Sequence, residues 1–275
     1  MGRLNGKVAV VTGAAGVLCS VMVESLLREG AKVALADLNE DHAKTVQKTL
    51  AEKGLTQTMT VGVNVLERAV LEAARDKILA QWGRIDILVN GAGGNHPKGT
   101  CPAEQYTEGV KLEDSFFGLD LAGFEFVNKL NFIGSLLPSQ VFCQAMVKTG
   151  GSVINISSMS ATQPLTKVAA YSAAKAAIEN FTRWLAVHLA PVNIRVNAIA
   201  PGFFITNQNR FLMLEKDEKT LTARGQKVIN KTPMHRFGEP KDLCGALTYL
   251  VSDEASFVTG VVIPIDGGFL AYSGV

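Results

Sequence analysis

Short apolar runs rich in β-branched residues alternate with amphipathic helical patterns along almost the whole chain of 275 residues. Strands that are separated by helices are joined by right-handed crossovers, so they lie parallel in one sheet with helices on both faces. The sequence therefore predicts an α/β fold built on one doubly wound parallel sheet of about seven strands. The expected strands are 7–11, 32–36, 59–63, 85–89, 152–156, 194–198 and 261–265. The expected helices are 17–29, 39–53, 66–82, 124–148, 169–189 and 240–251.

No proline, serine or glycine tract and no block of charge interrupts this alternation, so residues 1–275 are expected to form a single domain. Two connections, 94–121 and 203–239, are too long to be plain turns. Both follow the carboxyl ends of expected strands, where ligands bind in open parallel sheets. We expect both to be loops that contact a substrate.

The composition argues against several classes of function. A net charge of +2 is too small to favour nucleic acid or an anionic membrane surface as a partner. Apolar residues make up 47% of the chain, which a sheet buried on both faces explains in part and a subunit interface explains further. The four cysteines lack metal-ligand spacing and fit a reducing compartment, so a cytoplasmic protein without a metal site is expected. Residues 8–23 carry no charge, but Thr12, Gly13 and Gly16 interrupt them and they fit a strand and the turn after it; no other stretch approaches the ~20 apolar residues of a membrane span.

A glycine-containing turn follows the first expected strand and opens the first expected helix. Its backbone amides, around Gly13, Gly16, Val17 and Leu18, lie where a helix N-terminus binds a pyrophosphate group. Asp37 ends the second expected strand. A carboxylate there accepts hydrogen bonds from both hydroxyls of an adenosine ribose and repels a 2′-phosphate. The sequence therefore favours NAD (NADH) over NADP as the cofactor.

Tyr171 and Lys175 stand four residues apart, on one face of an expected helix. A free tyrosine titrates near pH ~10, and a neighbouring cation lowers that value, which suits proton exchange with a hydroxyl or ketone. Ser158 precedes the tyrosine by thirteen residues, and Asn131 precedes the serine by twenty-seven. A serine hydroxyl near the tyrosine is suited to hold a substrate oxygen.

These motifs, together with 90–93 and Pro201-Gly202 after later strands, make the chain resemble the short-chain dehydrogenase/reductase family along nearly its whole length. The resemblance implies a Rossmann-type fold and a catalytic set of Asn131, Ser158, Tyr171 and Lys175. Tyr171 then donates the proton and Ser158 orients the carbonyl. Lys175 lowers the tyrosine pKa and holds the nicotinamide ribose, while Asn131 holds a water that links Lys175 to solvent.

The chain departs from the family in its glycine motif. The family usually spaces three glycines as Thr-Gly-x3-Gly-x-Gly, whereas Val17 and Cys19 stand here in place of the last two. The resemblance nevertheless implies further contacts to the dinucleotide. These are Asn64 and Val65 after the third strand, Asn90, Gly91 and Ala92 after the fourth, and Pro201, Gly202 and Thr206 after the sixth, in addition to Tyr171 and Lys175.

The two long connections supply the expected substrate contacts. Residues 203–236 contain seven Lys or Arg against three Asp or Glu, a net charge of +4. This charge suits an anionic substrate, and it equally fits an exposed basic helix. The candidate substrate-binding residues are Asn95, His96, Lys98, Ser158, Lys167, Asn207 and Arg210, of which Lys98, Lys167 and Arg210 are the candidates for a carboxylate.

Within the family, several segments resemble the branch of D-mannonate oxidoreductases (fructuronate reductases): 16–20, 90–98, 164–167, 201–204 with 207–210, and 266–269 with 271–275. That resemblance implies interconversion of D-fructuronate and D-mannonate with NAD(H), and a homotetramer as in most relatives. A gluconate 5-dehydrogenase or another polyol dehydrogenase is the neighbouring alternative. A non-catalytic, dinucleotide-binding regulator is the alternative from another class.

Overall fold

The computed structural model describes residues 2–207 and 209–274, so Met1, Gln208 and Val275 lie outside the description. Within the described residues, seven parallel strands form one sheet in the order β3-β2-β1-β4-β5-β6-β7. The strand order reverses between β1 and β4, and a crevice opens at such a point beyond the carboxyl ends of the strands. The strands are β1 (Val8–Thr12), β2 (Lys32–Asp37), β3 (Thr58–Gly62), β4 (Ile87–Asn90), β5 (Gly151–Ile156), β6 (Ile194–Pro201) and β7 (Val262–Ile265).

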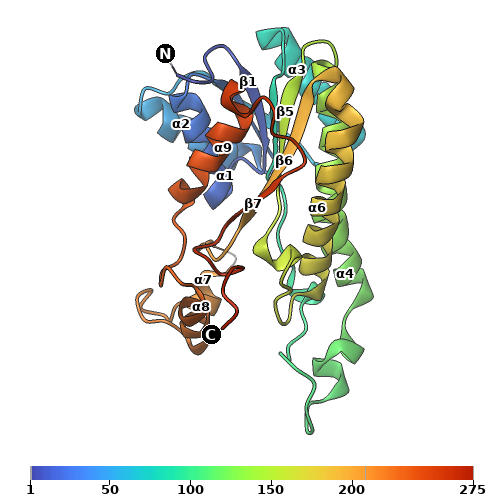
Figure 1. Cartoon of the computed structure of the whole chain (residues 1–275), viewed down its shortest axis with the longest axis vertical. Coiled ribbons are helices and arrows are strands. Elements are labelled where there is room, and N and C mark those ends of the chain that lie inside the picture. Colours follow the sequence, from blue (N-terminus) through green and yellow to red (C-terminus); the bar gives the residue numbers. More distant parts are fainter. Residues whose placement is uncertain (1, 208, 275) are drawn as a thin grey trace.

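Helices cover both faces of the sheet, as Figure 1 shows, with α1, α2 and α9 on one face and α3, α5 and α6 on the other. Alternate residues of a strand point to opposite faces. In β1, Ala9 and Val11 accordingly pack with the α1 layer, and Val8 and Val10 pack with the opposite layer. The helices are α1 (Val17–Arg28), α2 (Glu40–Glu52), α3 (Arg68–Trp82), α4 (Leu121–Asn128), α5 (Gly134–Phe142), α6 (Ala169–Leu189), α7 (Arg210–Met213), α8 (Ala223–Lys231) and α9 (Cys244–Val251).

The expected strands are confirmed, with ends shifted by at most three residues, but the expected helix 124–148 is wrong as one continuous element. It begins at Leu121 and is interrupted by a π-helical turn at Lys129–Ile133 before α5 and a 3₁₀ turn follow. Two features explain the interruption. The Asn131 side chain donates to the Val127 carbonyl, which in a regular α-helix would accept from the Asn131 backbone amide. Pro138 within α5 has no backbone N–H to donate. The range 240–251 likewise begins as a 3₁₀ turn, Pro240–Leu243, before α9.

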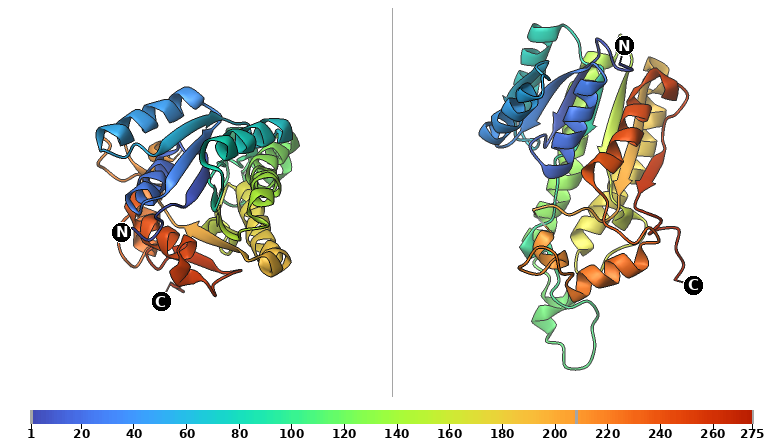
Figure 2. Two further views of the ribbon diagram at one scale, coloured as in Figure 1. Left: turned by 90° about the horizontal axis from the view of Figure 1, so that it is seen from above. Right: turned by 90° about the vertical axis from the view of Figure 1, so that its left-hand side faces the viewer.

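The two long connections lie together at one end of the molecule, beyond the carboxyl ends of the strands (Figures 1 and 2). The connection 94–121 carries only short 3₁₀ turns, whereas 203–239 contains α7 and α8. Glu104 of the first connection forms ion pairs with Arg224 and Lys227 of α8. The described helices include none that is long and apolar enough to cross a membrane.

Candidate active site

Two adjoining hollows follow the carboxyl edge of the sheet. A cleft of about 480 Å³ extends from Gly13 to Thr206, and a cavity of about 280 Å³ is lined by Ser158, Tyr171 and Lys175. The lining residues Leu18, Gly91, Gly93, Ile156 and Thr206 are common to both. The cleft therefore leads directly into the cavity that contains the expected catalytic side chains.

The N-terminus of α1 opens into the cleft. Gly16 is its N-cap, and no side chain caps the helix, so its first amides are available to an anion. Gly13 has a φ of +64°, and a Cβ at this position would lie 2.9 Å from the Cα of Ala92. Gly13, Gly16, Val17 and Leu18 all line the cleft as expected. This cradle fits the pyrophosphate of a dinucleotide.

Cys19 stands where the family has a glycine. Its side chain fits because the residue opposite it, Gly91, has no side chain. The Cys19 side chain is buried, and a Cβ at Gly91 would lie 2.3 Å from its Sγ. The Thr12 hydroxyl accepts hydrogen bonds from the amides of Gly91 and Ala92, at 3.1 and 3.2 Å. Helix α1 therefore stays close to the loop after β4. Burial raises the pKa of the Cys19 thiol to about 12, so the thiol is protonated at neutral pH.

Asp37 lines the cleft at the place where the sequence predicts an adenosine ribose. Its Oδ2 accepts from the Ala15 amide at 2.9 Å and its Oδ1 from the Asn39 amide at 3.0 Å. Each oxygen keeps acceptor capacity for a ribose hydroxyl. Asn64 and Val65 line this part of the cleft as expected, as do Leu38 and His42, for which the sequence offered no signal.

The catalytic cavity combines the end of β5 with one face of α6. Ser158 caps the turn after β5 and accepts from the Ser160 amide at 3.2 Å. Lys175 is only 4% exposed, and its Nζ donates to the Ile156 carbonyl at 2.7 Å. The same ammonium group lies over the Tyr171 ring, 5.4 Å from the ring centroid. The structure thus brings Ser158, Tyr171 and Lys175 together.

Burial shifts both titrating groups of this cavity. It raises the pKa of the Tyr171 phenol, and a hydrogen bond with Ser158 opposes this to a smaller extent. Burial lowers the pKa of Lys175 to about 8. The expected lowering of the tyrosine pKa by Lys175 is not found in this structure, because the ammonium donates to the Ile156 carbonyl and lies over the ring face. The raised pKa keeps Tyr171 protonated, as a proton donor requires.

Asn131 supports the cavity without lining it. Its amide nitrogen donates to the carbonyls of Gly94 and Val127, at 2.7 and 2.8 Å, and its Oδ1 accepts from the Gly94 amide at 3.1 Å. Both amide hydrogens are therefore used within the protein, whereas Oδ1 keeps acceptor capacity for the expected water. These hydrogen bonds also fix the loop after β4 beside Lys175.

Asn90 also differs from its expected place. Its side chain is buried behind the sheet, where it donates to Ser139 and Asn155, and it does not line the cleft. Gly91 and Ala92 do line the cleft, and Pro201, Gly202 and Thr206 line the catalytic cavity as expected.

Only some of the expected substrate contacts reach the hollows. Asn95 and Ser158 line the catalytic cavity, and Asn207 lines the cleft. His96 is turned into its own loop, where its Nδ1 accepts from the Lys98 amide at 3.2 Å and its ring packs edge-on against Phe126. Neither His96 nor Lys98 lines the cavity.

The remaining two cationic candidates are also placed elsewhere. Lys167 has a φ of +73°, its carbonyl accepts from the Cys101 amide at 2.7 Å, and its side chain does not line the cavity. Arg210 is exposed and pairs with Glu218 at 3.4 Å. The cation that 203–239 contributes to the cavity is Arg224, which sequence reasoning missed. The only feature of the sequence that pointed to Arg224 was the net positive charge of this segment.

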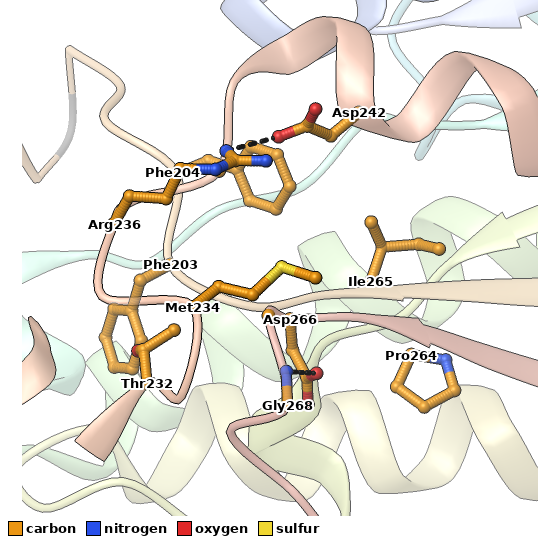
Figure 3. Close-up of a pocket in the computed structure, with 12 residues that line it drawn as sticks. Phe203, Phe204, Thr232, Met234, Arg236, Asp242, Pro264, Ile265, Asp266 and Gly268 are labelled. Carbon is orange, nitrogen blue, oxygen red and sulfur yellow. Dashed lines mark hydrogen bonds and ion pairs between the residues drawn. The ribbon is translucent and has the colours of Figure 1, made fainter.

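A third hollow, of about 390 Å³, shares Phe203 and Phe204 with the catalytic cavity (Figure 3). Its charged groups are already paired within the protein. Arg236 contacts Asp242 at 2.7 Å, and Asp266 accepts from the Gly268 amide at 2.9 Å (Figure 3). This hollow therefore offers less to a polar ligand than the catalytic cavity. The described residues also contain no cluster of three or more His, Cys, Asp or Glu that could hold a metal ion.

Comparison with known proteins assigns the chain to a family. The profile of a family described as enoyl-(acyl carrier protein) reductase matches residues 13–270. The chain is 50% identical over 275 residues to UxuB of Bacillus subtilis, an uncharacterized oxidoreductase, and the match covers 99% of this chain and 98% of UxuB.

Two solved structures are similar to the whole chain. A protein from Haemophilus influenzae with bound NAD, provisionally named a D-mannonate oxidoreductase, has a TM-score of 0.94 and 47% identity, covering 100% of this chain and 98% of the other. A gluconate 5-dehydrogenase from Burkholderia cenocepacia in complex with NADP and tartrate has a TM-score of 0.85 and 28% identity, with coverage of 98% and 97%. The chain belongs to the short-chain dehydrogenase/reductase family, and it is an oxidoreductase with the Rossmann-type fold of that family.

The buried Lys175 gives a prediction for stability against pH. Its pKa of about 8 in the folded protein lies below the ordinary lysine value of 10.5, so burying its charge costs free energy below pH 8, and that cost disappears as the pH rises towards 10.5. The free energy of unfolding of the wild type minus that of Lys175→Met should increase by ~2 kcal/mol between pH 7 and pH 10. Urea unfolding of both proteins measures this difference, and other titrating groups cancel in it. Parallel profiles would contradict the assigned pKa.

Proposed function

We propose that the protein interconverts D-fructuronate and D-mannonate by NAD-dependent hydride transfer. The observation that carries this proposal is the cavity lined by Ser158, Tyr171 and Lys175 at the end of a cleft into which the uncapped N-terminus of α1 opens. The similar Haemophilus influenzae protein, provisionally named a D-mannonate oxidoreductase, contains NAD and supports both the substrate and the cofactor.

The cleft favours NAD over NADP. The uncapped N-terminus of α1 would hold the pyrophosphate, and the Asp37 carboxylate would accept from the adenosine ribose hydroxyls and repel a 2′-phosphate. Lys175 and the Pro201-Gly202 turn border the nicotinamide end, where the cleft enters the catalytic cavity. When bound, NADH supplies the hydride that reduces the substrate carbonyl carbon.

The protein's own residues supply the proton and the orientation. In the direction of reduction, Ser158 holds the C5 carbonyl oxygen of the open-chain keto acid, and Tyr171 donates its proton to that oxygen. One hydride and one proton together convert the ketone into a secondary alcohol. Lys175, with a pKa of about 8, is suited to proton exchange near neutral pH and to holding the nicotinamide ribose.

A substrate comparison tests the proposal. D-Fructuronate and 5-keto-D-gluconate differ only in configuration, whereas D-fructose carries a hydroxymethyl group in place of the carboxylate of D-fructuronate. We expect the highest kcat/KM for D-fructuronate, measured from NADH absorbance. A higher value for 5-keto-D-gluconate would favour the gluconate 5-dehydrogenase alternative. Equal reduction of D-fructose would contradict a sugar-acid enzyme. If NADH binds but none of the three substrates is reduced, the result would favour the non-catalytic, dinucleotide-binding regulator.

A second prediction concerns the proton donor. Tyr171→Phe should leave NADH affinity nearly unchanged and lower kcat by ~10²–10⁴-fold, because the hydroxyl that donates the proton is lost. Tyr106→Phe, at a tyrosine that is 58% exposed on the 94–121 connection, serves as the matched control. Stopped-flow NADH oxidation gives both rates. Turnover of Tyr171→Phe near that of the wild type would refute the assignment.

We also propose a cytoplasmic homotetramer. Large apolar side chains on α6 are solvent-exposed in the single chain, with Trp184 56% and Val187 78% exposed. Apolar surface of this kind is typical of a subunit contact. Light scattering at micromolar concentration should give four times the chain mass of 29.3 kDa, and a monomer mass would exclude the assembly.

A further inference from the structure

We infer that Arg224 binds the substrate carboxylate and so makes the site selective for sugar acids over neutral ketoses. The inference rests on the proposed function, and it concerns a residue that none of the sequence motifs contains. Arg224 lies on the first turn of α8 and lines the catalytic cavity with Ser158 and Tyr171. It therefore borders the same space as the groups that would hold the ketone.

Arg224 is the available cation of this cavity. Among the described residues that line it, the other cation is Lys175, whose Nζ is buried and bonded to the Ile156 carbonyl. An anionic substrate in a partly buried cavity needs a positive partner, because an unpaired buried charge is costly. Arg224 is the side chain placed to provide that partner.

The guanidinium group of Arg224 has an unmet hydrogen-bonding need. The side chain is 23% exposed, and its Nη1 lies 3.5 Å from Oε1 of Glu104. Its Nε is fully buried and has no hydrogen-bond partner among the described residues, a state that is expensive for a charged donor. A carboxylate binds guanidinium through two parallel hydrogen bonds. A small rotation of the side chain that turns the Nε edge into the cavity would let a carboxylate satisfy this donor while Glu104 keeps the opposite end in place.

Hydrogen bonds and close packing hold the first turn of α8, which carries Arg224, in a fixed position. Thr222 caps the helix, since its Oγ1 accepts from the Gly225 amide at 3.0 Å and donates to the Leu212 carbonyl at 2.6 Å. A Cβ at Gly225 would lie 2.2 Å from the Met213 carbonyl oxygen, so this close approach requires glycine. Leu212 and Met213 themselves line the catalytic cavity. Arg224 is thus presented from a braced helix rather than a free loop.

The surroundings of Arg224 are also positively charged. Arg224, Leu165 and Phe203 line both the catalytic cavity and a neighbouring cavity of about 240 Å³ that Lys227 and Lys231 line as well. Lysines near a site raise the local concentration of anions, and an arginine within the site gives geometric selectivity. Glu104 lies between these cations and balances part of their charge.

Charge selectivity in variants tests the inference. Arg224→Gln should lower kcat/KM for D-fructuronate by ~30- to 1000-fold, as expected for loss of a charge-assisted contact, and change that for D-fructose by less than ~3-fold. Comparing each substrate between proteins cancels differences in open-chain content. Arg224→Lys should recover part of the loss. Lys216→Gln, at an exposed cation of the same connection that lines neither cavity, is the control and should change the ratio of the two substrates by less than ~3-fold.

Binding without turnover keeps this test separate from the proposed reaction. Calorimetric titration of D-mannonate into the wild-type protein saturated with NADH, a complex in which both partners are reduced and no hydride can transfer, should show binding that Arg224→Gln weakens by a similar factor. If the wild type binds D-mannonate but reduces no keto acid, the proposed function fails while Arg224 is still tested. Equal losses for D-fructuronate and D-fructose, unchanged charge preference in Arg224→Gln, or no binding of D-mannonate to the wild type would each overturn the role of Arg224. Thermal unfolding of each variant identifies any loss that comes from misfolding.

Discussion

The site depends on the close approach of two chain segments at the reversal of strand order. The turn after β1 and the loop after β4 touch because Gly13 and Gly91 lack side chains, and Thr12 holds them together through the amides of Gly91 and Ala92. This contact leaves the N-terminus of α1 open to an anion. It also places the loop after β4 beside Lys175, where Asn131 fixes it through Gly94. The nucleotide cleft and the catalytic cavity are continuous for this reason.

The sheet and the catalytic side chains were predictable because their signals are local. The alternation of apolar runs predicts every strand, and the spacing of Tyr171 and Lys175 follows from helical periodicity. The roles of Asn90 and Asn131 were not predictable in the same way. Each side chain turns towards partners that the fold brings from distant segments: Ser139 and Asn155 for one, Gly94 for the other. A motif gives the residue but not the direction of its side chain.

The three cations that the sequence suggested for a substrate carboxylate do not line the cavity, for a related reason. His96 and Lys98 follow β4 closely, but their short turn is stabilised by a hydrogen bond between them and faces away from the cavity. Arg224 comes much later in the chain and reaches the cavity only because the segment folds back, with Leu214 paired to Leu221 and α8 braced on α7. No pattern within 203–239 distinguishes Arg224 from the other six basic residues of the segment.

The ion pairs of Glu104 with α8 have a consequence for how such a protein diversifies. Residues 123 positions apart in the chain, Glu104 and Lys227, join the two long connections into one cap over the catalytic cavity. The cap contributes Thr206 and Asn207 to the edge of the nucleotide cleft, but none of the strands and neither Gly13 nor Gly91. Substitutions in the cap can therefore change which substrate is preferred while the side chains that carry out hydride transfer stay the same. Changes in Glu104 and α8 must then occur together, because each side of the cap neutralises charge on the other.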